Sequence, residues 1–179
     1  NYLNLKIVGN EPDSNHLLYN EKGLSYVSIS SKNKSILHIN FLKGSLGWRM
    51  KRSEHESSLK KAIGKHSHQL TIFDATAGQL NDSMIFLSLG HQVVAVEQSK
   101  ILYLLVSDAI KRASKELPIL NNLKFVNGNS IEIFKKDNNQ FDLIYLDPIY
   151  PIVKKNVKRS GNLDCIKEIL SFENLMSHG

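Results

Sequence analysis

The chain has 179 residues, of which 41% are hydrophobic and 22% are charged, and it contains one cysteine. This composition is typical of a single globular domain, and it excludes an internal disulfide and a zinc site built from cysteines. No apolar run approaches the roughly 20 residues that span a bilayer, and polar residues interrupt the first segment. We therefore expect no secretory leader and a cytoplasmic location.

The net charge of +6 is distributed unevenly along the chain. Seven Lys or Arg and two Glu lie between residues 43 and 65, and four Lys or Arg without an acid lie between residues 151 and 162. Two basic segments on a slightly acidic body predict a surface that binds a polyanion. Solvated surface lysines would give the same count, so the charge alone leaves both interpretations open.

Residues 1–52 predict a small β-rich segment. Gly, Pro, Asn and Ser separate its short apolar runs, which indicates an antiparallel unit. We expect strands at residues 5–8, 24–30 and 36–41. A basic loop at residues 43–52 follows, with two glycines and the single tryptophan. An S-x-x-E pattern from Ser53 to Glu56 then predicts a capped helix that ends at Gly64.

Residues 53–179 predict a second domain, in which short apolar strands alternate with helices. We expect the strands at residues 70–73, 92–96, 123–126 and 141–146. This alternation is typical of an α/β fold with a doubly wound, mostly parallel sheet of the Rossmann-like kind, whose helices cover both faces. The ligand of such a sheet lies at the carboxyl ends of the strands, so the four loops there form the candidate site.

The first of these loops runs from Asp74 through small residues to Gly78 and enters a helix. Small residues let backbone N–H groups approach a ligand, and a helix N-terminus favours a carboxylate or a phosphate. A glycine after a strand is also typical of an ordinary turn, so this loop alone does not decide between the two.

The second loop begins at Glu97, nineteen residues after Gly78. A carboxylate at this place can accept two hydrogen bonds from ribose hydroxyls. The alternative is a first-turn acid that stabilises the next helix, and the spacing favours the ribose. The third loop, residues 127–130, offers short polar side chains that could bind an adenine edge or cap a helix.

The fourth loop, Asp147-Pro148-Ile149-Tyr150-Pro151, carries the most specific pattern. An exocyclic amine on a nucleic-acid base is a poor nucleophile, because its lone pair is delocalised into the ring, and it must be held in line with the group that it attacks. The Asp147 carboxylate and the Pro148 carbonyl could accept its two hydrogens, and Tyr150 could stack on the base. The alternative is a rigid turn after a buried strand.

The basic segments carry the candidate contacts to RNA. Trp48 could stack on a base while neighbouring cations hold phosphate groups, or it could cover a joint between two parts of the chain. The expected RNA-binding residues are Lys43, Trp48, Arg49, Lys51, Arg52, Lys154 and Lys155. His66 and His68 lack a convincing third ligand, so we expect no metal site.

Together these motifs resemble RsmJ, a bacterial family of methyltransferases that act on the N2 amine of a guanosine in 16S ribosomal RNA. The similarity covers residues 36–151 and is clearest in DATAG (residues 74–78) and DPIYP (residues 147–151). It implies S-adenosylmethionine as the methyl donor, without a metal, and ribosomal RNA or the small ribosomal subunit as the partner. We expect a monomer that makes no contact with a membrane.

The resemblance also implies roles for individual residues. Carried over by position, cofactor contacts fall on Asn81, Asp82, Glu97, Gln98, Asn129, Ser130 and Asp147. The first loop adds Asp74 and Gly78 to the expected cofactor site. Asp147, Pro148 and Tyr150 would place the acceptor amine.

The sequence departs from the RsmJ pattern at three positions. Leu80 and Asn81 stand where the family has Gly and Arg, and Gln98 stands where it has Arg. Leu80 would restrict the backbone beside the cofactor. The family's sheet has seven strands, so we expect its last strands to be missing from this sequence. Two alternatives therefore stay open: an adenine-N6 methyltransferase, and a non-catalytic remnant that binds RNA or the cofactor.

Overall fold

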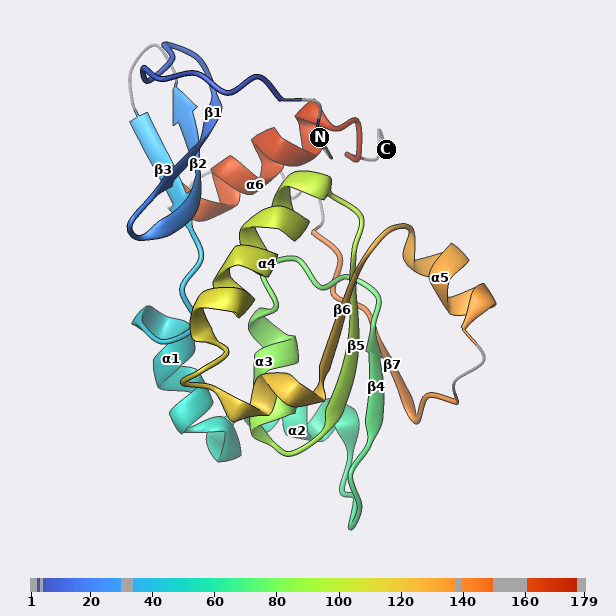
Figure 1. Ribbon diagram of the computed structural model, residues 1–179. Helices are drawn as coiled ribbons and strands as arrows, with labels where there is room; N and C mark the ends of the chain where they lie inside the picture. Colours follow the sequence, from blue (N-terminus) through green and yellow to red (C-terminus); the bar gives the residue numbers. More distant parts are fainter. Residues whose placement is uncertain (1–2, 4, 30–33, 138–139, 150–160, 177–179) are drawn as a thin grey trace, which may run out of the picture.

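The computed structural model describes residues 3, 5–29, 34–137, 140–149 and 161–176. Within them a small antiparallel sheet lies beside a parallel sheet and its helices (Figure 1). The helices are α1 (Gly44–Lys51), α2 (Ser57–Ile63), α3 (Asn81–Ser88), α4 (Lys100–Ala113), α5 (Ser130–Lys136) and α6 (Gly161–Phe172), with 3-10 turns η1 (Ser53–His55) and η2 (Pro118–Asn122). No helix in this part of the chain combines the length and the apolar character needed to cross a membrane.

The antiparallel sheet forms as expected, but one of its strands lies elsewhere in the sequence. Its strands, in spatial order, are β1 (His16–Asn20), β2 (Gly23–Ile29) and β3 (Lys34–His38). The expected strand at residues 5–8 is wrong, because these residues are exposed and form no strand. β1 occupies a segment where we expected a loop. A two-residue turn allows this, since Gly23 pairs with Asn20 and has a φ of +102°, a conformation that favours glycine.

The antiparallel sheet packs on α4 and α6 (Figure 1). Tyr26 of β2 belongs to the same hydrophobic core as Leu105 of α4 and Ile169 of α6. Asp108 of α4 accepts a hydrogen bond from the backbone N–H of Leu24 at 2.9 Å. The N-terminal segment therefore supports the long helix that follows the second strand of the parallel sheet.

The basic segment after β3 is helical, so the expected loop at residues 43–52 is wrong. α1 begins at Gly44, and its buried Gly47 lies so close to the preceding chain that a Cβ atom would be 2.9 Å from the Leu42 carbonyl oxygen. Gly47 thus allows close packing, and Gly44 begins the helix with a φ of +72°, so neither glycine breaks it. The expected capping box does not form, because α2 begins at Ser57 with Glu56 as its N-cap, and the Glu56 side chain makes no cap hydrogen bond.

The parallel sheet confirms the predicted Rossmann-like fold. Its strands are β4 (Thr71–Asp74), β5 (Gln92–Glu97), β6 (Leu123–Asn127) and β7 (Leu143–Tyr145). Their spatial order is β6-β5-β4-β7, and all pairs are parallel. The chain moves from β4 to β5 and β6 on one side and returns to β7 on the other. The strand order therefore reverses at β4, which is where a ligand is expected in this class of sheet.

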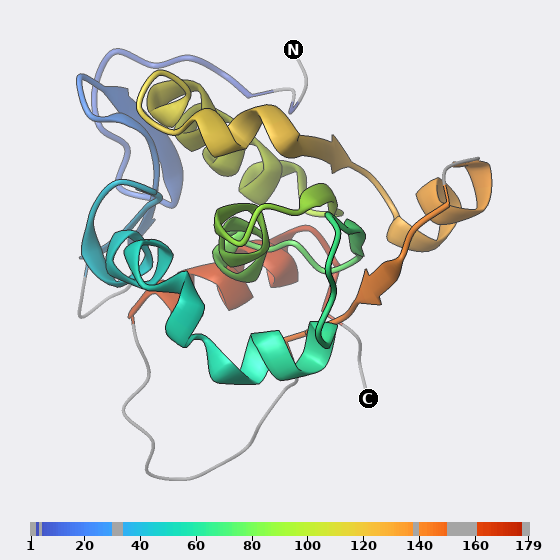
Figure 2. The same ribbon diagram turned by 90° about the horizontal axis from the view of Figure 1, so that it is seen from below.

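The two faces of the parallel sheet are covered unequally. α3 and α4 lie against one face, and α5 stands on the opposite side in both views (Figure 1 and Figure 2). On that opposite face the buried side chains of Phe73, Val94 and Val96 pack against Ile133 and Phe141. The prediction that strand 141–146 is buried on both faces is wrong, because Ile144 is 48% exposed and Leu146 is 64% exposed.

Candidate functional site

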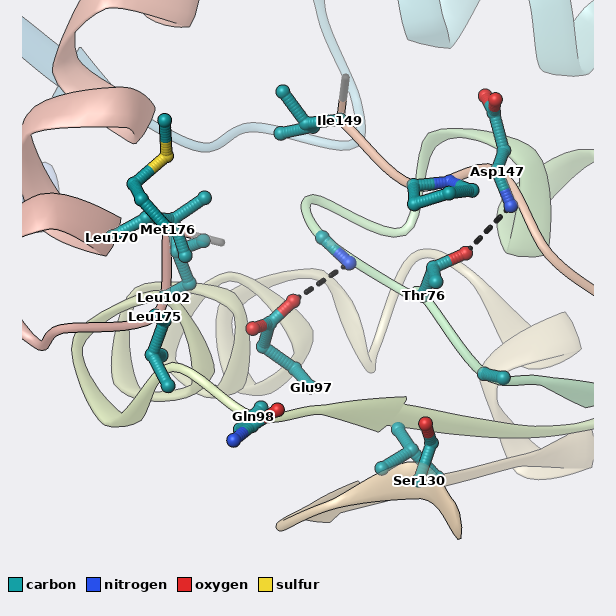
Figure 3. Close-up of a pocket in the computed structure, with 14 residues that line it drawn as sticks. Thr76, Glu97, Gln98, Leu102, Ser130, Asp147, Ile149, Leu170, Leu175 and Met176 are labelled. Atoms are coloured by element: carbon teal, nitrogen blue, oxygen red, sulfur yellow. Dashed lines mark hydrogen bonds between the residues drawn. The ribbon is translucent and has the colours of Figure 1, made fainter. Parts of the chain in front are cut away.

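Loops at the carboxyl ends of the parallel strands line a cavity of about 300 Å³ (Figure 3). Its polar wall comes from the loops after β4, β5, β6 and β7. The residues of this wall are Thr76, Gly78, Glu97, Gln98, Ser130 and Asp147. Apolar side chains of α4, α6 and the segment after α6 line the cavity as well: Leu102, Leu170, Leu175 and Met176. The cavity thus combines a few polar groups with an apolar surface, as small-molecule sites usually do.

Glu97 is the most firmly held polar group of this cavity. Its side chain is at the end of β5 and only 8% of the residue is exposed. One carboxylate oxygen accepts a hydrogen bond from the Gly78 N–H at 2.9 Å, and the other accepts one from the Ser99 N–H at 2.7 Å. Gly78 has a φ of +51°, which favours glycine, and the turn that it makes directs its N–H to Glu97.

Burial raises the pKa of Glu97 to about 7, although the two N–H donors favour its ionised form. A carboxylate offers about four acceptor positions on its two oxygens, and backbone N–H groups occupy two of them here. Glu97 can therefore hold the loop after β4 and still accept hydrogen bonds from a ligand. Both interpretations of Glu97 from the sequence, ribose binding and helix stabilisation, are compatible with this geometry.

Asp74 does not line the 300 Å³ cavity. It is 2% exposed, and it accepts hydrogen bonds from the Ser83 hydroxyl at 2.5 Å and from the Thr76 N–H at 3.1 Å. Burial raises the pKa of this carboxyl group. These contacts join the end of β4 to α3, so Asp74 stabilises the conformation of the loop after β4 by hydrogen bonds.

The loop after β7 is fixed to the loop after β4 through its main chain. The Ala75 N–H donates to the Tyr145 carbonyl at 3.0 Å, and the Asp147 N–H donates to the Thr76 hydroxyl at 2.8 Å. The Asp147 side chain is exposed, and its carboxylate points away from Glu97 (Figure 3). Pro148 and Ile149 also line the cavity, and Tyr150 lies outside the described residues.

A second cavity of about 220 Å³ lies beside the first, and Asp147 lines both. Asn81 and Asp82, which we expected at the cofactor, line this second cavity. Asp82 accepts hydrogen bonds from the Tyr145 hydroxyl at 2.8 Å and from Arg49 at 3.2 Å. The structure therefore separates these two residues from Glu97, Gln98 and Ser130, while Asp147 stands at the boundary.

Leu80 points into the hydrophobic core. It is fully buried, lines neither of these two cavities, and has a φ of +63° in the left-handed region. A glycine, which the resemblance places here, would adopt this backbone conformation without strain. Leu80 thus fills the core from a strained position rather than obstructing the cofactor cavity.

Of the third loop, only Ser130 lines the first cavity. Asn129 instead caps α5, because its side-chain oxygen accepts hydrogen bonds from the N–H groups of Ile131 and Glu132. This is the capping role that the sequence left open for the polar residues of this loop.

Comparisons with known proteins show the family of this chain. Residues 2–174 match the family described as "Putative SAM-dependent methyltransferase", where SAM is S-adenosylmethionine. The chain belongs to this family. A protein from Desulfotalea psychrophila, named ribosomal RNA small subunit methyltransferase J, is 32% identical over 166 residues. The alignment covers 88% of this chain and 64% of that protein.

Two further relatives extend the comparison. A protein of the same name from Francisella tularensis subsp. novicida is 31% identical over 143 residues, which cover 76% of this chain and 58% of that protein. The crystal structure of a SAM-dependent methyltransferase from Neisseria gonorrhoeae superposes with a TM-score of 0.65 at 30% identity, covering 80% of this chain and 61% of that chain. The predicted family is confirmed, and the chain spans about three fifths of the length of these relatives.

The residues that we expected to bind RNA differ in their exposure. Lys43, Trp48, Lys51 and Arg52 are exposed on or beside α1, and the Arg52 guanidinium lies 4.7 Å from the centre of the Trp48 ring. Arg49 differs, because it is half-buried and paired with Glu56 and Asp82. The expected contacts Lys154 and Lys155 lie outside the described residues.

No group of three His, Cys, Asp or Glu side chains in the described residues is arranged to hold a metal ion. The His66 and His68 rings contact one another edge to face, with centroids 5.8 Å apart.

Sequence reasoning missed the apolar wall of the cavity and the role of Tyr145. Leu170, Leu175 and Met176 come from the end of the chain, and no local motif marks them as ligand contacts. Tyr145 did carry a signal, since a hydroxyl within an otherwise apolar strand next to DPIYP needs a partner when it is buried.

Proposed function

We propose that this chain binds S-adenosylmethionine in the 300 Å³ cavity and directs its methyl group to an exocyclic amine of ribosomal RNA. One observation supports this proposal most directly: Glu97 and Asp147 line the same cavity, at the ends of the two strands that flank β4. The first is suited to ribose hydroxyls and the second to an amine, which are the two groups that this reaction must bring together.

The residues of the first cavity fit the cofactor. S-adenosylmethionine, when bound, supplies a methyl group on a positively charged sulfur. Glu97 has free acceptor positions for ribose hydroxyls, and Gln98 and Ser130 offer further polar groups at the rim. Leu102 and Leu175 provide an apolar surface for a purine ring. The Gly78 loop would hold the methionine end of the cofactor.

Asp147 and Pro148 are the proposed acceptors for the substrate amine. The Asp147 carboxylate and the Pro148 carbonyl would each accept one amine hydrogen and so fix the direction of the nitrogen lone pair. Asp147 lies between the two cavities, so the base can approach from the side of the second cavity while the cofactor occupies the first. Stacking of Tyr150 on the base stays a prediction.

The proposed substrate is the N2 amine of a guanosine in 16S ribosomal RNA. The matched relatives are named ribosomal RNA small subunit methyltransferase J, and the exposed basic residues of α1 offer a surface for phosphate groups. We further propose that the protein works in the cytoplasm as a monomer, apart from membranes.

The test is a transfer assay with labelled S-adenosylmethionine and small ribosomal subunits or 16S RNA that lack the modification, followed by nucleoside analysis of the product. We expect label in N2-methylguanosine. Label in N6-methyladenosine would show that the adenine alternative is correct. Absence of transfer, together with absence of cofactor binding, would identify a non-catalytic remnant of the fold.

A further inference from the structure

A chain of hydrogen bonds joins the basic helix α1 to strand β7 through the N-terminus of α3. Arg49 of α1 donates to both carboxylate oxygens of Glu56, from Nε at 2.8 Å and from Nη2 at 3.0 Å. The same Nη2 donates to Asp82 Oδ1 at 3.2 Å. The other oxygen of Asp82 accepts the hydroxyl of Tyr145 at 2.8 Å. Each carboxylate oxygen of Asp82 thus receives one donor from a different element.

Partial burial and packing restrain the side chains of this network. The side chains of Arg49 and Asp82 are only 29% and 23% exposed, and the Tyr145 ring packs edge to face on Phe86 with centroids 5.0 Å apart. Burial and the hydrogen bond to Asp82 raise the pKa of Tyr145, so its hydroxyl keeps its proton and donates. Ion pairs with Glu56 and Asp82 also raise the pKa of Arg49, which stays charged.

This network of hydrogen bonds ends at Tyr145, two residues before Asp147, which is the proposed acceptor for the substrate amine. Tyr145 is held on its side chain by Asp82 and on its main chain by Ala75, whose N–H donates to the Tyr145 carbonyl at 3.0 Å. Asp147 follows two residues later, and its N–H is bonded to Thr76. The position of Tyr145 therefore determines the position of Asp147.

Charge gives a second reason for this arrangement. Asp74, Asp82, Asp147 and Tyr145 line the same 220 Å³ cavity, so three carboxyl groups lie close together at the ends of β4 and β7 and the start of α3. The Arg49 guanidinium brings a positive charge to this acidic group from outside the sheet. Without it, repulsion between the carboxylates would favour movement of the loop that carries Asp147.

We propose that Arg49, Asp82 and Tyr145 are positioning residues that hold Asp147 at a fixed place relative to helix α1. This inference rests on the proposed function, because α1 carries the exposed Trp48, and its C-cap is the exposed Arg52, both of which would contact RNA. An RNA held on α1 then meets Asp147 at a set distance, and a displacement of about 1 Å can reduce transfer by about 100-fold. Arg49 and Asp82 act on Asp147 through Tyr145.

Tyr145→Phe tests this directly, because it removes one hydroxyl and keeps the ring. Tyr26→Phe is the matched control, since it removes a hydroxyl that donates to Glu168 at 3.2 Å, between β2 and α6. For Tyr145→Phe we expect kcat to fall at least tenfold, with the Kd for S-adenosylmethionine and the KM for RNA within twofold of wild type. Tyr26→Phe should keep the wild-type kcat. A kcat for Tyr145→Phe equal to that of wild type or of the control would overturn the inference.

A substitution at Arg49 distinguishes a positioning role of this residue from direct contact with RNA. Arg49→Lys keeps the charge but loses the planar fork that binds Glu56 and Asp82 together. Positioning predicts a lower kcat, with KM and the salt dependence of RNA binding unchanged. A raised KM and a shallower salt dependence, with kcat unchanged, would instead show that Arg49 contacts RNA.

Amide hydrogen exchange gives a readout that needs no activity. The amides of Ala75 and Asp147 should exchange at least tenfold faster in Tyr145→Phe than in wild type, and Tyr26→Phe should leave them unchanged. Equal exchange in all three proteins would overturn the inference. Failure of the wild type to transfer a methyl group would overturn only the proposed function, since the exchange result decides the positioning role by itself.

Discussion

The two carboxylates of the proposed site are held in different ways. Glu97 is buried, and main-chain N–H groups from two loops bind both of its oxygens. Asp147 is exposed, and the hydrogen bond that fixes it binds its main chain and leaves its carboxylate directed away from Glu97. The part of the site that would bind the cofactor is thus pre-organised around Glu97. The Asp147 carboxylate, which would accept a hydrogen bond from the amine, is instead accessible to a large substrate.

The largest expected effect tests the acceptor end. Asp147→Ala should lower kcat by about 100-fold or more, because the amine loses the acceptor that orients it. The affinity for RNA should stay within twofold of wild type. Single-turnover transfer and separate binding assays measure these quantities, with Asp164→Ala, an exposed acid in the first turn of α6, as the control. Retained transfer in Asp147→Ala would remove Asp147 from the mechanism.

The next effect tests the cofactor end. Glu97→Gln should weaken S-adenosylmethionine binding by about 10- to 100-fold, because hydrogen bonds to a charged acceptor are worth about 1.5–3 kcal/mol. Affinity of the wild type should fall as the pH decreases below about 7, since protonation removes the charge that the ribose hydroxyls favour. Calorimetry across this range should find a flat profile for Glu97→Gln, and a flat wild-type profile would contradict the role of Glu97.

Protonation of Glu97 also affects folding, with the opposite sign. Its pKa of about 7 lies above the ordinary value of 4.5, so the folded chain binds this proton more tightly than the unfolded chain. The resulting stabilisation, of the order of 3 kcal/mol, is complete below pH 4.5 and is lost as the pH rises through 7. The difference in unfolding free energy between wild type and Glu97→Gln should therefore change over this range and be constant above it.

A substitution of Leu80 should have a smaller effect, which changes the free energy of unfolding and leaves cofactor binding unchanged. Leu80→Gly relieves the left-handed backbone but empties a fully buried position, so the loss of about 2–5 kcal/mol from the side chain outweighs a gain of about 1–2 kcal/mol. Thermal unfolding should show net destabilisation, with unchanged cofactor affinity. Tighter cofactor binding by the glycine variant would instead show that Leu80 obstructs the site.

The smallest effect concerns the RNA-facing helix. Arg52→Ala should weaken RNA binding a few-fold and reduce its dependence on salt, because one phosphate contact is lost. Filter binding between roughly 50 and 200 mM salt measures this slope. Salt-independent binding by the wild type would count against α1 as a phosphate-binding surface.

The sequence predicted the parallel sheet and its ligand edge because their signals are local. Apolar strands such as β5 end directly at polar loops, and the topology of parallel strands brings these loops together. The helix α1 was missed because Gly44 and Gly47 suggest a loop, whereas Gly47 is required by a close approach to the chain at Leu42. A local pattern does not reveal such tertiary contacts.

The same limit applies to the candidate site. Glu97 and Asp147 were placed in one cavity from strand ends alone, and the structure agrees. Arg49 was assigned to RNA from charge and Asp82 to the cofactor from the resemblance, and the sequence did not predict that the two side chains bind each other across 33 residues. Pairing of this kind depends on how α1 packs against α3, which no sequence motif states.

A calorimetric titration of the wild-type chain with S-adenosylmethionine at pH 8, with Glu97→Gln in parallel, tests most directly whether the Glu97 cavity binds the cofactor. We expect saturable binding at one site per chain, weakened by the substitution. Absence of binding heat, together with an unchanged thermal unfolding midpoint in the presence of the cofactor, would contradict it.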